Sequence, residues 1–71
     1  MDEKINDFVI FCLEGYKLKN SLTGKEAYDI FDKYGIFDYL TKGYDVLHTQ
    51  GEPYLMNDIE EIIKIRKENR I

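Results

Sequence analysis

Apolar residues recur along the first part of the chain with the period of an α-helix. Between about Glu3 and Lys19 the apolar positions are Ile5, Phe8, Val9, Cys12 and Tyr16. This is the spacing of one helix face. Ile10 and Leu13 widen the face, so we expect neighbours on more than one side of this helix. Gly15 costs about 1 kcal/mol relative to alanine; it either permits close approach of another helix or frays the last turn.

A second helix is predicted from the residues at its N-terminus. Thr23 followed by Glu26 forms a capping box, in which each side chain satisfies the free backbone amide of the other residue. Leu22 and Ala27 occupy the positions of a hydrophobic staple. The predicted buried positions of this helix are Ala27, Ile30, Phe31 and Tyr34. Gly35 stands where a left-handed residue commonly ends a helix.

Two further helices follow from the same kind of pattern. The third is predicted over Ile36–Lys42 and ends at Gly43. The last helix is predicted to begin at Asn57, a favourable N-cap, with acidic residues in its first turn. Those acids are Asp58, Glu60 and Glu61, and the inner face is formed by Ile59, Ile62 and Ile63.

The segment from Tyr44 to Met56 holds the only histidine and the only proline of the chain. One interpretation is a short helix over Tyr44–Gln50 with Val46 and Leu47 pointing inward. The other is a hairpin with arms at Val46–His48 and Tyr54–Met56. Low β-branched content favours a helical turn followed by an extended passage. The predicted fold is therefore one mainly α domain over residues 1–71. It is a compact bundle of three to five short helices with a short extended segment before the last.

The composition indicates a globular protein without covalent or metal support. Apolar residues make up 44% of the 71 positions, which is ample for a core. A single cysteine forms no internal disulfide, and its place in the apolar run Phe8–Leu13 indicates a buried thiol. The run is too short for a membrane span, and acids precede it. We expect a soluble, cytoplasmic protein with no membrane association.

The charge balance argues against nucleic acid as a partner. The net charge is -4 and is shared evenly by the two halves of the chain, whereas phosphate recognition depends on concentrated lysine and arginine. The one basic cluster is Lys64, Arg66, Lys67 and Arg70. These cations suit the last turns of a helix, where the macrodipole is negative.

The sequence gives no pattern that predicts catalysis. Asp45, His48 and Thr49 have suitable side chains for a triad, but neighbours in sequence do not face one another. We therefore interpret His48 as a structural or hydrogen-bonding residue. No glycine-rich phosphate loop occurs. We expect no enzymatic activity, no catalytic residue, no metal site and no cofactor.

The tyrosines and the Tyr44–Met56 segment predict a surface for binding another protein. Tyrosine combines large contact area with a polar tip and is enriched at interfaces. A domain this small cannot bury all of its tyrosines deeply. The predicted partner-binding residues are Tyr39, Tyr44, Asp45, His48, Thr49, Gln50 and Tyr54. A homodimer is a further candidate assembly, because small domains are marginally stable alone.

The order FVIFCLEGYK, TGKEAYDIFDKYGIFDYL and YDVLHTQGEPYLMNDIEEII resembles a small bacterial family of unknown function. The resemblance covers roughly residues 5–67, and its members are stand-alone proteins of about this length with a Y-D-x-L-H-T segment. The most distinctive matches are Gly24-Lys25-Glu26, Tyr34-Gly35, Tyr39-Leu40, Tyr44…Leu47-His48-Thr49 and Asp58-Ile59. Such genes are often described beside a family similar to ADP-ribosyltransferase toxins. The resemblance thus implies an antitoxin or regulatory partner of a toxin-like enzyme.

The sequence therefore predicts a non-enzymatic protein-interaction module. Two alternatives stay open. One is a small DNA-binding transcriptional regulator that uses Lys64–Arg70 on phosphates. The other is a small-molecule sensor or accessory subunit with a pocket near His48.

Overall fold

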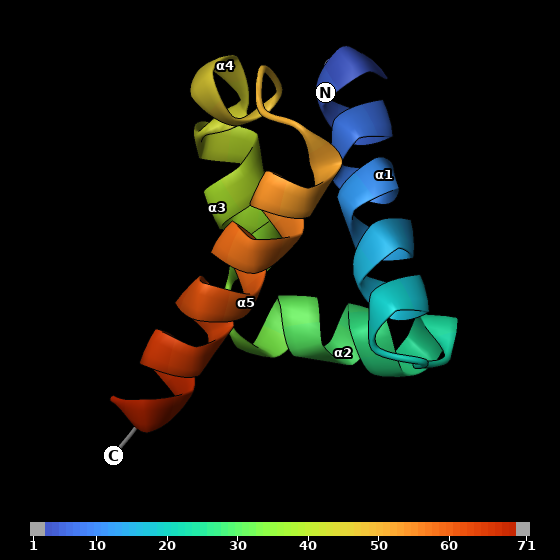
Figure 1. Ribbon diagram of the computed structural model, residues 1–71, viewed down its shortest axis with the longest axis vertical. Helices are drawn as coiled ribbons and strands as arrows, with labels where there is room; N and C mark the ends of the chain where they lie inside the picture. The colour runs from blue at the N-terminus through green and yellow to red at the C-terminus, as the bar shows by residue number, and fades with distance from the viewer. Residues whose placement is uncertain (1–2, 70–71) are drawn as a thin grey trace.

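The computed structural model describes residues 3–69, which form five helices and no strand. The helices are α1 (Glu3–Lys19), α2 (Gly24–Lys33), α3 (Ile36–Lys42), α4 (Tyr44–Leu47) and α5 (Glu52–Glu68). The prediction of a mainly α bundle is confirmed. Figure 1 shows α1 and α3 standing beside one another, with α2 crossing at their lower end. Helix α4 lies at the opposite end, and α5 runs obliquely across the front.

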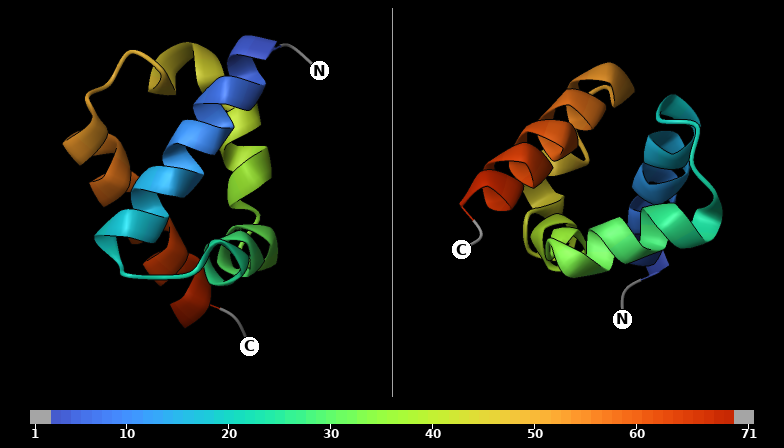
Figure 2. Two further views of the ribbon diagram at one scale, coloured as in Figure 1. Left: turned by 90° about the vertical axis from the view of Figure 1, so that its right-hand side faces the viewer. Right: turned by 90° about the horizontal axis from the view of Figure 1, so that it is seen from below.

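The first three helices lie where the sequence predicted them. Helix α1 has the expected bounds, and α2 begins with the capping box. The Glu26 amide donates to Thr23 Oγ1 at 3.1 Å, while the Thr23 amide donates to Glu26 Oε1 at 2.9 Å. Gly35 adopts the left-handed conformation, with φ 67°, between α2 and α3. The chain can therefore turn sharply there and send α3 back along α1 (Figure 2).

The prediction of an extended passage before the last helix is wrong. Helix α5 begins at Glu52, so Tyr54–Met56 is helical and Asn57 lies inside the helix instead of capping it. Pro53 occupies the first turn, where a proline needs no backbone N–H partner and its fixed φ already suits a helix. The added turn buries Leu55 and Met56 four and three residues before Ile59. Only Gly51, with φ -70° and ψ 156°, has extended backbone at the entrance.

The short helix predicted after Gly43 is present, but one of its inward residues points outward. Leu47 is 7% exposed, as predicted, whereas Val46 is 67% exposed. Consecutive residues of a helix diverge by about 100°. A four-residue helix lying against the end of α3 can therefore bury only one of the two.

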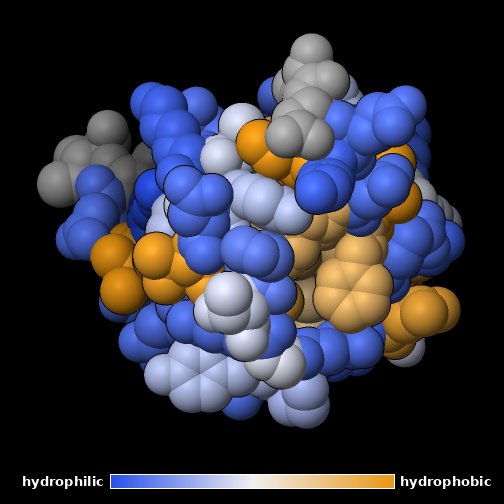
Figure 3. Space-filling model, turned by 90° about the horizontal axis from the view of Figure 1, so that it is seen from above, coloured by the Kyte–Doolittle hydropathy of each residue, from blue (hydrophilic) through white to orange (hydrophobic). Residues whose placement is uncertain are grey.

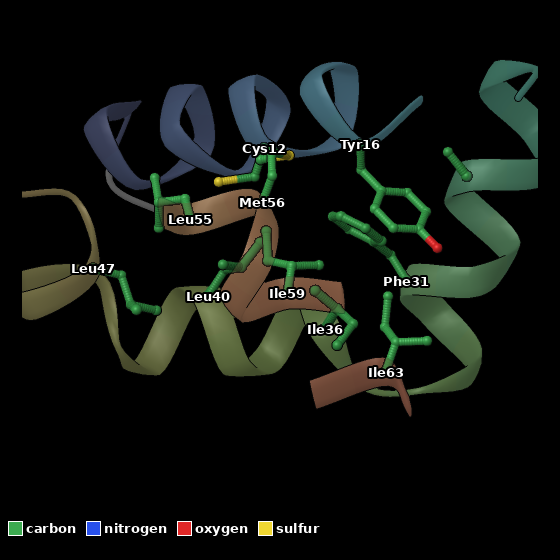
Figure 4. Close-up of a cluster of buried hydrophobic side chains, with 11 residues drawn as sticks. Cys12, Tyr16, Phe31, Ile36, Leu40, Leu47, Leu55, Met56, Ile59 and Ile63 are labelled. Carbon is green, nitrogen blue, oxygen red and sulfur yellow. The ribbon is translucent and has the colours of Figure 1, made fainter. Parts of the chain in front are cut away.

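The core takes side chains from all five helices (Figure 4). Its buried members are Cys12, Tyr16, Ala27, Phe31, Ile36, Leu40, Leu47, Leu55, Met56, Ile59 and Ile63. Cys12 is fully buried, which confirms the prediction of a structural thiol. The rings of Tyr16 and Phe31 meet at 5.3 Å, joining α1 to α2. None of the helices within residues 3–69 combines the length and the apolar character needed to cross a membrane.

Gly15 permits a close approach of α5 to α1. A β-carbon placed at Gly15 would lie 3.2 Å from the Met56 sulfur and 3.3 Å from the Met56 terminal methyl carbon. These separations are tighter than ordinary van der Waals contact. Of the two explanations that the sequence left open for Gly15, the structure favours helix packing.

The left-handed conformation of Gly35 makes this residue sensitive to substitution. We expect Gly35→Ala to lower the free energy of unfolding by about 1–2 kcal/mol, because a β-carbon is strained at positive φ. The new β-carbon would also lie 3.1 Å from Arg66 Nη1. Gly24→Ala is the matched control, since no atom lies within 4 Å of its β-carbon position. Urea unfolding followed by circular dichroism measures both; equal losses would contradict this explanation.

Candidate protein-interaction surface

An aromatic stack lies at the end of the molecule that carries α4. The rings of Tyr44 and His48 are parallel, with an interplanar angle of 9° and centroids 4.3 Å apart. One helical turn separates the two residues, so helix geometry places them on the same face. The Phe8 ring of α1 meets Tyr44 edge-on at 5.5 Å. The stack therefore joins α4 to the first turns of α1.

The His48 ring is oriented by a contact with the backbone. Its Nδ1 lies 2.6 Å from the carbonyl oxygen of Tyr44. A carbonyl oxygen only accepts, so this contact requires the proton on Nδ1. The other ring nitrogen, Nε2, is then an acceptor in the neutral imidazole. Because His48 is exposed, this acceptor is offered to the outside of the molecule.

Three other predicted residues surround the stack in different ways. Asp45 is exposed and forms no ion pair with any described residue. The Thr49 hydroxyl donates to the carbonyl oxygen of Val46 at 2.7 Å and so helps to end α4. The Oε1 atom of Gln50 is buried and has no hydrogen-bond partner. Gln50 as a whole is half-buried, so part of its side chain still faces solvent.

Two predicted residues lie apart from the stack. The Tyr39 hydroxyl donates to Asp58 Oδ2 at 2.6 Å, which ties α3 to α5. Burial, followed by this hydrogen bond, raises the pKa of Tyr39 to about 12. Tyr54 is exposed on α5 beside Asn57 and Asp58. The predicted surface is thus divided into an α4 group, formed by Tyr44, Asp45 and His48, and an α3–α5 group, formed by Tyr39 and Tyr54.

Sequence reasoning did not place Val46 and Phe8 beside the α4 group, where Val46 belongs to the same helix and Phe8 meets the Tyr44 ring. Both are apolar, and apolar residues were assigned to the core by default. The signal for Val46 was available, because a helix of one turn cannot bury two consecutive residues. Seen from the α4 end, the surface is mostly hydrophilic with separate exposed hydrophobic patches (Figure 3).

The basic cluster near the C-terminus is partly used by the fold. The Arg66 guanidinium donates to the carbonyl oxygen of Tyr34 at the end of α2. It also lies over the Tyr39 ring, 5.8 Å from its centroid. Arg66 therefore satisfies a helix-terminal carbonyl and holds α5 against the α2–α3 turn. Lys64 and Lys67 are exposed, and Arg70 lies outside the described residues.

Residues 7–66 match the family described as a protein of unknown function, DUF3791. The match covers most of the chain, so the chain belongs to this family. Searches of curated proteins and of solved structures return no match. Within residues 3–69, no group of three or more histidine, cysteine, aspartate or glutamate side chains is arranged to hold a metal ion.

The hydrogen bond between Tyr39 and Asp58 predicts a measurable loss on substitution. We expect Tyr39→Phe to lower the free energy of unfolding by about 1–2 kcal/mol, because a partly buried bond to a charged group is removed. Tyr54→Phe is the control, since its hydroxyl makes no hydrogen bond with a described residue, and we expect a change within about 0.5 kcal/mol. Chemical denaturation compares the two. Indistinguishable stabilities would mean that the bond contributes nothing.

Buried protonated groups predict a loss of stability at alkaline pH. Burial, then the charge of Glu52, raises the pKa of Cys12 from 9.0 to about 12, and the pKa of Tyr39 is raised from 10.0 to about 12. In this range the unfolded chain releases protons that the folded chain retains, so the free energy of unfolding falls as pH rises. The loss begins near pH 9 and continues to about 12.

A Cys12→Ala variant separates the two groups. Between about pH 9 and 12 the thiol is ionised in the unfolded chain but held protonated in the folded chain, so the variant is expected to show a shallower fall than the natural chain across this range. The part of the fall that comes from tyrosines, Tyr39 among them, begins near pH 10 and is present in both chains. Unfolding curves at fixed salt across this range provide the measurement, and identical slopes below pH 10 would refute the assignment to Cys12.

Proposed function

We propose that this chain is a non-enzymatic protein-interaction module that acts in the cytoplasm. The observation that carries the proposal is the α4 group together with Val46. The core does not use the Val46 side chain, although it is apolar and 67% exposed. Beside it stand the Tyr44–His48 stack and the Asp45 carboxylate, which forms no ion pair within residues 3–69. Apolar, aromatic and hydrogen-bonding groups on one rigid turn are typical of a recognition surface.

The geometry of the stack supports recognition by hydrogen bonding as well as by contact area. The contact of Nδ1 with the Tyr44 carbonyl orients the His48 ring, and in the neutral ring with its proton on Nδ1 the outer nitrogen is an oriented acceptor. A partner would supply an N–H or O–H donor to this nitrogen. Orientation before binding lowers the entropy lost on association.

In its finer form, the proposal is that the chain is the antitoxin or regulatory partner of a toxin-like enzyme encoded nearby. This part rests on the resemblance to small bacterial proteins found beside ADP-ribosyltransferase-like genes. It requires the chain to bind one protein stoichiometrically and to suppress that protein's activity. Arg66 is already engaged by Tyr34 and Tyr39, so fewer basic groups are left for the alternative of DNA binding.

The α4 group predicts which substitutions weaken the complex. With the neighbouring gene's product as the partner, we expect His48→Ala and Val46→Ala each to raise Kd about tenfold or more. Leu18→Ala is the control, because Leu18 is an exposed apolar residue of α1 outside the α4 group. Titration calorimetry measures affinity, and circular dichroism establishes that each variant is folded. Unchanged affinity in both folded variants would exclude this surface.

A further inference from the structure

A second apolar surface lies on the face formed by α1, α2 and α3. It is a groove of about 290 Å³ lined by Asn6, Val9, Ile10, Leu13, Tyr28, Phe37 and Thr41. No lining residue comes from α4 or α5. Ile10 is 49% exposed and Tyr28 is 54% exposed, so the groove is open to solvent along its length.

The residues that line the groove are only partly covered by the rest of the protein. The Tyr28 ring packs on Phe37 at 5.0 Å, and Phe37 packs in turn on Phe31 in the core. Val9, Leu13 and Phe37 are partly buried against the core. Ile10 and Tyr28 nevertheless stay about half exposed, so the groove presents apolar surface that the core does not cover. Contiguous exposed apolar surface of this kind marks interaction sites.

The charges available beside the groove are negative. Four lysines of α1–α4 are in ion pairs: Lys17, Lys19, Lys25 and Lys42. Lys33 lies over the Tyr34 ring, and Lys4 is also engaged. By contrast, five exposed carboxylates of these helices form no ion pair with any described residue: Glu3, Asp7, Glu26, Asp32 and Asp45. Of these, Glu26 accepts a hydrogen bond from the Thr23 amide.

Two of these carboxylates lie about one helical turn from residues that line the groove. Asp32 stands four residues after Tyr28 on α2, and Glu3 stands three residues before Asn6 on α1. Residues at these spacings share a helix face. An apolar groove with carboxylates that form no ion pair one helical turn away complements a surface that is apolar in the middle and cationic at its margins.

We propose that this groove binds an amphipathic helix of a partner protein, with bulky apolar residues on one face flanked by lysine or arginine. A ridge of helix side chains fits a groove between packed helices. A second copy of the chain would bring like carboxylates together, which is unfavourable. The inference rests on the proposed function in one respect, that the chain binds a protein, but it concerns a surface separate from the α4 group.

The first experiment uses two synthetic helices of about 18 residues with the same leucine face. One carries lysine beside that face and the other carries glutamate. Titrated into the isotopically labelled chain, the lysine peptide is expected to shift amide resonances of the groove-lining residues. Its Kd should rise as salt is increased, because part of the attraction is electrostatic. Equal binding of the glutamate peptide, or shifts confined to α4 and α5, would overturn the proposal.

Matched variants test whether the lysine peptide binds in the groove. Ile10→Ser, at a half-exposed position, is expected to weaken binding of the lysine peptide about tenfold, and Asp32→Asn to weaken it less and reduce its salt dependence. Leu18→Ser is the control, because Leu18 is exposed on the same helix and does not line the groove. Loss of affinity with Leu18→Ser equal to that with Ile10→Ser would count against the assigned site.

Two further readouts separate this inference from the proposed function. His48→Ala should leave peptide affinity unchanged, because His48 does not line the groove. If the native partner responds to His48→Ala and not to Ile10→Ser, the groove proposal fails and the proposed function survives. Analytical sedimentation tests whether a second copy of the chain occupies the groove instead of a partner helix. A dimer that Ile10→Ser converts to a monomer would show that a second copy covers the groove and would overturn the proposal.

Discussion

The whole structure depends on burying one apolar cluster to which every helix contributes. Helices of four to seventeen residues are marginal in water when isolated, so each is stable only through the face it gives to this cluster. Phe31, Leu40 and Ile59 are fully buried on three different helices. The polar contacts that link helices, such as Tyr39 with Asp58, lie at the margin and fix orientation more than they supply stability.

No polar or charged residue is buried among the described residues, so both proposed recognition surfaces lie on the outside of the molecule, on two different faces. The α4 group offers a hydrogen-bond acceptor on His48 and an aromatic stack, whereas the groove offers apolar depth beside Ile10 and Tyr28. A six-to-two excess of carboxylates over lysines marks the end formed by residues 3–10, 38–47 and 52–58, while the other described residues balance. The α4 group and the part of the groove formed by Asn6, Val9, Ile10 and Thr41 belong to this end, where a negative field would attract the cationic partner that we propose.

Local signals in the sequence were sufficient for most of the fold. The capping box at Thr23 and the apolar period of α1 each depend on neighbours a few residues away, so they could be predicted. The start of α5 was missed because Asn57 is also a favourable N-cap, and burial of the preceding turn overrides that preference. Tyr39 and Arg66 could not be assigned, because their partners stand 19 and 32 residues away. For the proposed interaction surface, the sequence predicts which residue types take part, but not which of these residues lie on the same face of the molecule.

The contact of Met56 with Gly15 has a consequence for oxidative chemistry. The thioether of Met56 is 3% exposed and fits against the bare backbone of α1, so the folded chain shields it from oxidants. Conversion to the sulfoxide adds a polar oxygen to this side chain, at a contact so close that even a β-carbon at Gly15 would lie 3.2 Å from the sulfur. Oxidation at this sulfur is therefore expected to weaken the packing of α5 against α1.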